Sequence, residues 1–99
     1  MTRTELAAWL DARRPVPPPA LRQHLMAFVQ DTPGPLHAHL ADAGVALLGR
    51  VLNRPEGGRE LALDLLAADA LVTYAFEAQA EEDVGSLTEL ARRIAEGRA

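Results

Sequence analysis

Asp69 is the residue whose position most directly suggests chemistry. It interrupts an apolar stretch, residues 61–80, where helical spacing places it between Leu65 and Phe76 and turns its carboxylate toward the core. An ionised carboxylate is costly to bury unless it is paired. A carboxylate held in such surroundings can act as a general acid or base, so Asp69 is the first candidate for a functional site.

Other polar and aromatic residues could complete a pocket around this carboxylate. Thr73 and Glu77 follow Asp69 at four-residue intervals, which places all three on one helix face. The predicted catalytic residues are therefore Asp69 and Glu77, and the predicted ligand-binding residues are His37, Thr73, Tyr74 and Phe76. The alternative is structural, and we favour it: an arginine, the Trp9 indole or the Tyr74 hydroxyl would satisfy a buried Asp69.

Metal binding and nucleophilic catalysis have little support in the sequence. The chain has no cysteine and three histidines, His24, His37 and His39. On a helix the rings of His37 and His39 point about 200° apart, at 100° per residue. His39 and Asp42 share a face, but one imidazole and one carboxylate fall short of the three or four ligands of a zinc site. We therefore expect no metal and no cofactor.

The charge pattern bears on partners. Ten arginines against 14 acidic residues give a net charge of −4, so the basic stripe of a nucleic-acid-binding protein is not expected. The first 55 residues are net positive and the remainder net negative, so the two halves could pair within one chain or between two. Glu81, Glu82 and Asp83 form an acidic run that could bind a cationic protein partner, or could be neutralised by Arg13–Arg14 or Arg92–Arg93.

Leucine and alanine dominate the composition, and β-branched residues are few, which favours helices. No segment alternates with period two. We therefore predict an all-α fold, a single domain over residues 1–99, in which a compact bundle of about five helices surrounds a long central fourth helix. The predicted helices span residues 3–12, 19–30, 36–52, 59–83 and 86–96.

Local signals mark several helix ends. Thr2 with Glu5, and Ser86 with Glu89, fit the capping box in which a side chain satisfies free amides at a helix start. The proline-rich run at residues 15–19 cannot be helical until its last proline. Gly44 lies inside the third predicted helix, where it could either break the helix or permit close contact with a neighbour.

The apolar stretch at residues 61–80 has the length of a membrane span, but it contains Asp64, Asp69 and Glu77. We therefore read it as a buried helix of a soluble protein. The chain starts without an apolar signal core, so we expect a cytoplasmic location.

The fourth helix also suggests a function. Its main apolar stripe, expected to face the core, consists of Leu61, Leu65, Ala68, Val72 and Phe76. Further apolar residues point in other directions, so part of the surface is expected to stay uncovered in a monomer. The leading hypothesis is a small interaction or regulatory module that forms a homodimer through this helix. The alternative is a small-molecule-binding protein or acid/base enzyme that uses Asp69.

Overall fold

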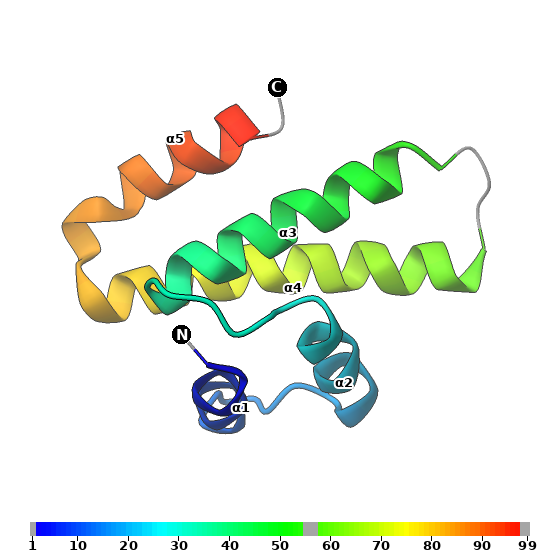
Figure 1. Cartoon of the computed structure of the whole chain (residues 1–99), viewed down its shortest axis with the longest axis horizontal. Helices are drawn as coiled ribbons and strands as arrows, with labels where there is room; N and C mark the ends of the chain where they lie inside the picture. Colours follow the sequence, from blue (N-terminus) through cyan, green and yellow to red (C-terminus); the bar gives the residue numbers. More distant parts are fainter. Residues whose placement is uncertain (1, 55–57, 98–99) are drawn as a thin grey trace.

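The computed structural model describes residues 2–54 and 58–97, and the regular secondary structure in these ranges is helical, with no strand (Figure 1). A single turn of 3-10 helix, η1, connects the last two α-helices. The all-α prediction is confirmed. The elements are α1 (Arg3–Asp11), α2 (Pro19–Ala27), α3 (Leu36–Leu52), α4 (Arg59–Glu82), η1 (Val84–Ser86) and α5 (Leu87–Gly97).

The two longest helices, α3 and α4, form an antiparallel pair at the centre of the fold (Figure 1). Helix α3 runs unbroken through Gly44, so this glycine permits close contact rather than a break. A Cβ atom built on Gly44 would lie 2.8 Å from Cγ2 of Val72 and 3.3 Å from the backbone nitrogen of Val72. The absence of a side chain at Gly44 therefore sets how closely the two helices approach.

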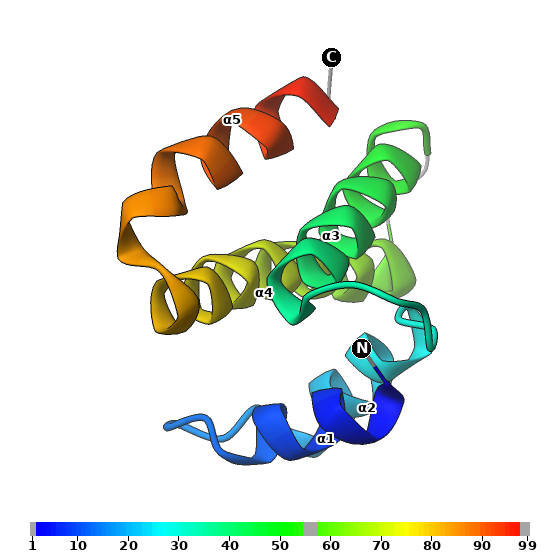
Figure 2. The same ribbon diagram turned by 60° about the vertical axis from the view of Figure 1, so that its left-hand side comes forward.

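The remaining helices cover opposite sides of the α3–α4 pair. Helices α1 and α2 lie on one side, and α5 lies on the other (Figure 2). The largest fully buried side chains all come from α1, α2 and the central α3–α4 pair. They are Leu6, Leu10, Leu25, Leu40, Leu47 and Leu71. Helix α5 contributes a single buried residue, Leu90, and an ion pair of 3.1 Å between Arg93 and Asp42 on α3.

The predicted orientation of α4 is wrong. Of the predicted stripe only Ala68 is buried, and Leu65 is 50% exposed. The face that is buried is built largely from alanine, and its members are Asp64, Ala67, Ala68, Leu71, Ala75, Ala78 and Gln79. Small side chains let neighbouring helices approach closely, so the alanine face packs inward and the larger leucines are turned aside.

Arg3 joins the start of α1 to the end of α2. Its guanidinium donates to the carbonyl oxygens of Met26 and Val29, the latter at 2.8 Å, and its backbone N–H donates to the Asp31 carboxylate. The last carbonyl groups of a helix lack partners within the helix, and a cation there also complements the helix dipole. A side chain from α1 thus satisfies the C-terminal end of α2.

Of the two predicted capping boxes, the structure shows one half of the first, the hydrogen bond to Thr2. The Thr2 hydroxyl accepts a hydrogen bond of 3.1 Å from the Glu5 backbone N–H at the start of α1. The Ser86 hydroxyl instead donates to the Asp83 carboxylate at 2.7 Å, and Glu89 pairs with Arg92. Asp83, which accepts from the Gly85 N–H at 3.0 Å, therefore organises the turn before α5.

Within the described ranges, no helix combines the length and the apolar character needed to cross a membrane.

Replacing Gly44 by alanine is expected to destabilise the fold by about 1–3 kcal/mol, because the added methyl group overpacks the α3–α4 contact. The measurement is urea denaturation followed by circular dichroism. Gly49→Ala is the matched control in the same helix, since a Cβ there meets no atom within 4 Å. That variant is expected to be stabilised by up to about 1 kcal/mol. Equal stability of the two variants would contradict a close contact at Gly44.

Candidate functional site

Asp69 lies at the surface and not in the core, which contradicts its predicted burial. It borders an open cleft of about 210 Å³ that is formed by α3, α4 and α5. Asp69 is the single charged residue of this lining, and it makes no hydrogen bond or ion pair with any residue that the structure describes. The remaining lining is apolar: Val45, Leu48, Leu65, Ala68, Val72 and Ile94.

The cleft therefore combines an apolar wall with one unpaired carboxylate at a solvent-exposed edge. Because water reaches Asp69, the site lacks the desolvation on which the acid/base interpretation of this residue depended. An exposed carboxylate can still attract a cation, and apolar walls can hold a short aliphatic group.

The other predicted site residues do not meet in this cleft. Thr73 and Glu77 are exposed, and they continue the predicted polar line along the outer side of α4. The half-buried Phe76 and Tyr74 pack against the core. The Tyr74 ring meets the Trp9 ring edge-on, with centroids 5.6 Å apart. Burial raises the pKa of the Tyr74 phenol, and the neighbouring Glu77 carboxylate acts in the same direction.

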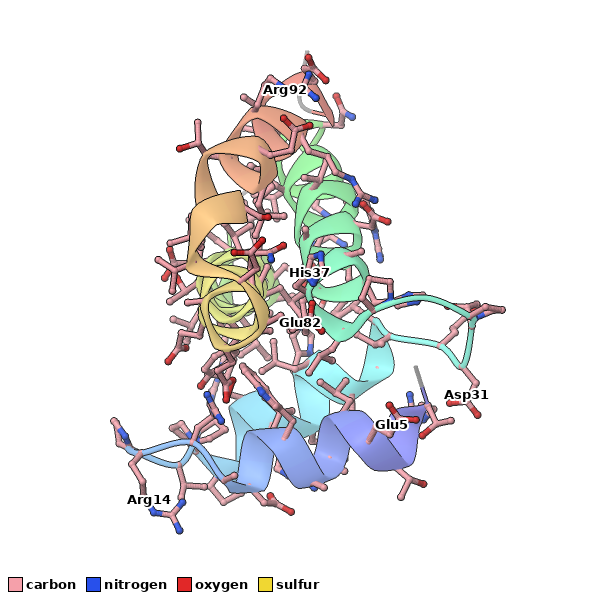
Figure 3. All side chains as sticks on the ribbon, turned by 90° about the vertical axis from the view of Figure 1, so that its left-hand side faces the viewer. Glu5, Arg14, Asp31, His37, Glu82 and Arg92 are labelled. Carbon is pink, nitrogen blue, oxygen red and sulfur yellow. The ribbon has the colours of Figure 1, made fainter. Side chains whose placement is uncertain are left out.

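His37 lies in the first turn of α3, beside the last turn of α4. Its Nδ1 atom is 3.0 Å from a carboxylate oxygen of Glu82, and the two side chains face each other in Figure 3. The alignment is too poor for a hydrogen bond, so Nδ1 is enclosed without a hydrogen-bond partner. His37 is therefore part of the α3–α4 contact and does not belong to the cleft around Asp69.

The carboxylate that is buried in this fold is Asp64, which is 6% exposed. Its Oδ1 atom accepts a hydrogen bond of 2.7 Å from Nε2 of His24, because an ionised carboxylate has no proton to donate. Its Oδ2 atom lies 2.9 Å from Nη1 of Arg54. These three residues connect α4 to α2 and to the segment that follows α3.

The pairing of a carboxylate with a histidine also occurs in catalytic triads, where a nucleophile completes the group. Here the chain has no cysteine, and its one serine, Ser86, donates to Asp83 beyond the far end of α4. The ring of His24 is packed edge-on against Phe28, with centroids 5.1 Å apart. The Asp64 cluster therefore acts as a structural ion pair that satisfies a buried charge.

Asp64 was not singled out as the buried carboxylate, although the sequence carries a signal for it. It precedes Ala68 by four residues and Leu71 by seven, so it shares a helix face with both. Choosing the alanine-rich face as the buried one would have identified Asp64. Its partner His24 is 40 residues away in the sequence, and no spacing rule connects them.

The acidic run at the end of α4 has partners within the fold. The Glu81 carboxylate accepts a hydrogen bond of 2.8 Å from the Trp9 indole and pairs with Arg13 at 3.2 Å. The Arg13 guanidinium also lies 3.9 Å from the Trp9 ring centroid, within the range of a cation–π interaction. The predicted neutralisation by the Arg13–Arg14 pair is thus confirmed for Arg13.

Glu82 lies beside His37, and Asp83 organises η1, so every member of the acidic run has a role inside this chain. A cationic partner would have to compete with these contacts. Among the described residues, no group of three or more histidine, aspartate or glutamate side chains is arranged to hold a metal ion.

Comparison of the chain with protein-family models, with curated proteins and with solved structures finds no match.

Asp64→Asn is expected to lower the free energy of unfolding by about 2 kcal/mol, because the hydrogen bond from His24 and the ion pair with Arg54 both lose the acceptor charge. Asp69→Asn, on the same helix, is expected to change it by less than about 0.5 kcal/mol. Urea denaturation of both variants measures the difference. A larger loss for Asp69→Asn would show that the structural role belongs to Asp69.

Proposed function

We propose that this protein is a helical interaction module that forms a homodimer through the outer face of α4. The observation that carries the proposal is a pair of adjacent leucines on α4, Leu65 and Leu66, which are 50% and 52% exposed. Leu65 borders the cleft beside Asp69, and about half of each side chain is left exposed. Two neighbouring leucines left in water on the longest helix are typical of a surface that a partner covers.

The position of these leucines supports association. They lie in the N-terminal part of α4, at the end of the α3–α4 pair where α3 finishes with the exposed Leu52 (Figure 1). Burying an exposed leucine side chain contributes about 1.5–3 kcal/mol, so a few such residues support reversible association. A second copy of the chain is the simplest partner, because two-fold homodimers are the commonest oligomers.

Sedimentation velocity over a concentration series tests this proposal. The wild-type chain is expected to shift from the 10.7 kDa monomer to a species of twice that mass. Leu66→Glu is expected to remain monomeric, because a charge in a buried leucine position is costly. The control is Val84→Glu, which alters a side chain that is 67% exposed in η1, beyond the opposite end of α4 from Leu66. A monomeric wild type at all concentrations would contradict the proposal.

A second candidate function is the binding of a small cationic amphiphile. The observation that favours it is the unpaired Asp69 at the edge of the apolar cleft. The cleft has a volume of about 210 Å³, which is smaller than the roughly 300–1,000 Å³ of typical ligand pockets. The matching ligand is therefore short, with an amine near Asp69 and an alkyl chain along Val45 and Leu48.

Hexylamine and hexanoate distinguish this second function, because they have equal chain lengths and opposite charges. Titrating each into the labelled protein is expected to shift the methyl NMR signals of Leu48, Val72 and Ile94 with hexylamine only. Asp69→Asn is expected to weaken that response severalfold, since the carboxylate supplies the charge selectivity. Equal shifts with hexanoate would show that the cleft has no preference for cations.

A further inference from the structure

A row of exposed residues runs along the N-terminal half of α4. Arg59, Ala62, Leu66 and Asp69 are spaced by three, four and three residues, so they lie on one helix face. All four are exposed, and they lie on the side away from the buried alanine face. We call them the α4 row. Its two ends carry opposite charges, and its middle combines a small residue with a large one.

The charged ends of the α4 row have no partners in the single chain. Neither Arg59 nor Asp69 makes an ion pair or hydrogen bond with any residue in the described ranges. On the same helix, Asp64 contacts His24 and Arg54, and Glu81 pairs with Arg13. Glu60 and Glu77, which lie outside the α4 row, make no ion pair with a described residue either. Arg59 and Asp69 are ten residues apart, about 15 Å along the helix, so they cannot pair with each other within one helix.

We propose that two copies of the chain pair through antiparallel α4 helices, with Arg59 of each copy opposite Asp69 of the other. The same arrangement places Leu66 of each copy on Ala62 of the other. This inference rests on the proposed homodimer and specifies its geometry. It gives partners to both charged ends of the α4 row and covers Leu66 with one symmetric contact.

The self-complementarity follows from the spacing. The pairs Arg59–Asp69 and Ala62–Leu66 have the same midpoint, position 64, so a single two-fold axis satisfies both. Each large side chain then meets a small one, which is the alternation that lets facing helices interdigitate. Leu65 flanks the row and adds apolar surface beside it.

Other arrangements of the same helices are less favourable. A parallel pair would place Asp69 on Asp69 and Arg59 on Arg59, which is repulsive. An antiparallel pair shifted by one turn would centre Leu66 on Leu66. That shift would place Arg59 opposite Thr73 and would leave Asp69 facing Leu63. The charges therefore select both the direction and the register of the pairing.

The size of the contact sets its strength. A row of about three helical turns buries less surface than the roughly 1,600 Å² of a standard stable interface, so the dimer is expected to be reversible. Exposed ion pairs are weak and are screened by salt. We expect dimerisation to weaken as the salt concentration rises.

Charge-reversal variants test the pairing. Arg59→Asp and Asp69→Arg, each alone, place like charges together at both ends of the row and are expected to raise the dimer dissociation constant about tenfold. The double variant Arg59→Asp/Asp69→Arg restores both ion pairs and is expected to return the constant to near its wild-type value. Sedimentation at low salt gives the constants, and circular dichroism confirms that each variant is folded.

Arg14→Asp is the control, because it makes the same change in net charge as Arg59→Asp at a residue outside the α4 row. It is expected to leave the dissociation constant unchanged. If the wild type dimerises and the single variants dimerise equally well, or the double variant fails to recover, this pairing is overturned while the proposed homodimer stands. If the wild type is monomeric, both are overturned.

Discussion

The close approach of α3 and α4 is the constraint on which the rest of the structure depends. Gly44 lies almost against Val72, and the facing side of α4 is made mostly of alanine. Once these two helices are fixed, α1 and α2 pack on one side of them and α5 on the other (Figure 2). The cleft beside Asp69 and the exposed leucines both follow from the rotation of α4 that this contact imposes.

Electrostatics connects the two halves of the chain. The net positive first half supplies Arg13 and Arg54, and the net negative second half supplies their partners Glu81 and Asp64. Of the two possibilities that the charge distribution left open, pairing within one chain is therefore present. This pairing within the chain is incomplete. Arg59 and Asp69, both from the second half, have no ion pair among the described residues.

Much of the fold could be predicted from the sequence because helix boundaries depend on local chemistry. Proline at the start of α2 and the hydroxyl of Thr2 mark their helix ends without reference to distant residues. The rotation of α4 could not be predicted in this way, since apolar residues lie on most of its sides and the positions of its leucines do not show which side is the core. For the same reason the leucine spacing points to Asp69 as the interior carboxylate, whereas the buried one is Asp64. The contact between Asp64 and His24 depends on tertiary packing.

The alanine face of α4 reverses the usual relation between side-chain size and tolerance to substitution. In most amphipathic helices the bulky residues are the ones that cannot be exchanged, because their removal leaves cavities. On α4, Ala67 and Ala75 are fully buried, so a larger side chain there would overpack the interior, whereas Leu65 and Leu66 are half exposed. Natural or designed variants of this chain can therefore change the leucines of the outer face, and with them the partner, while the small residues beneath keep the fold intact.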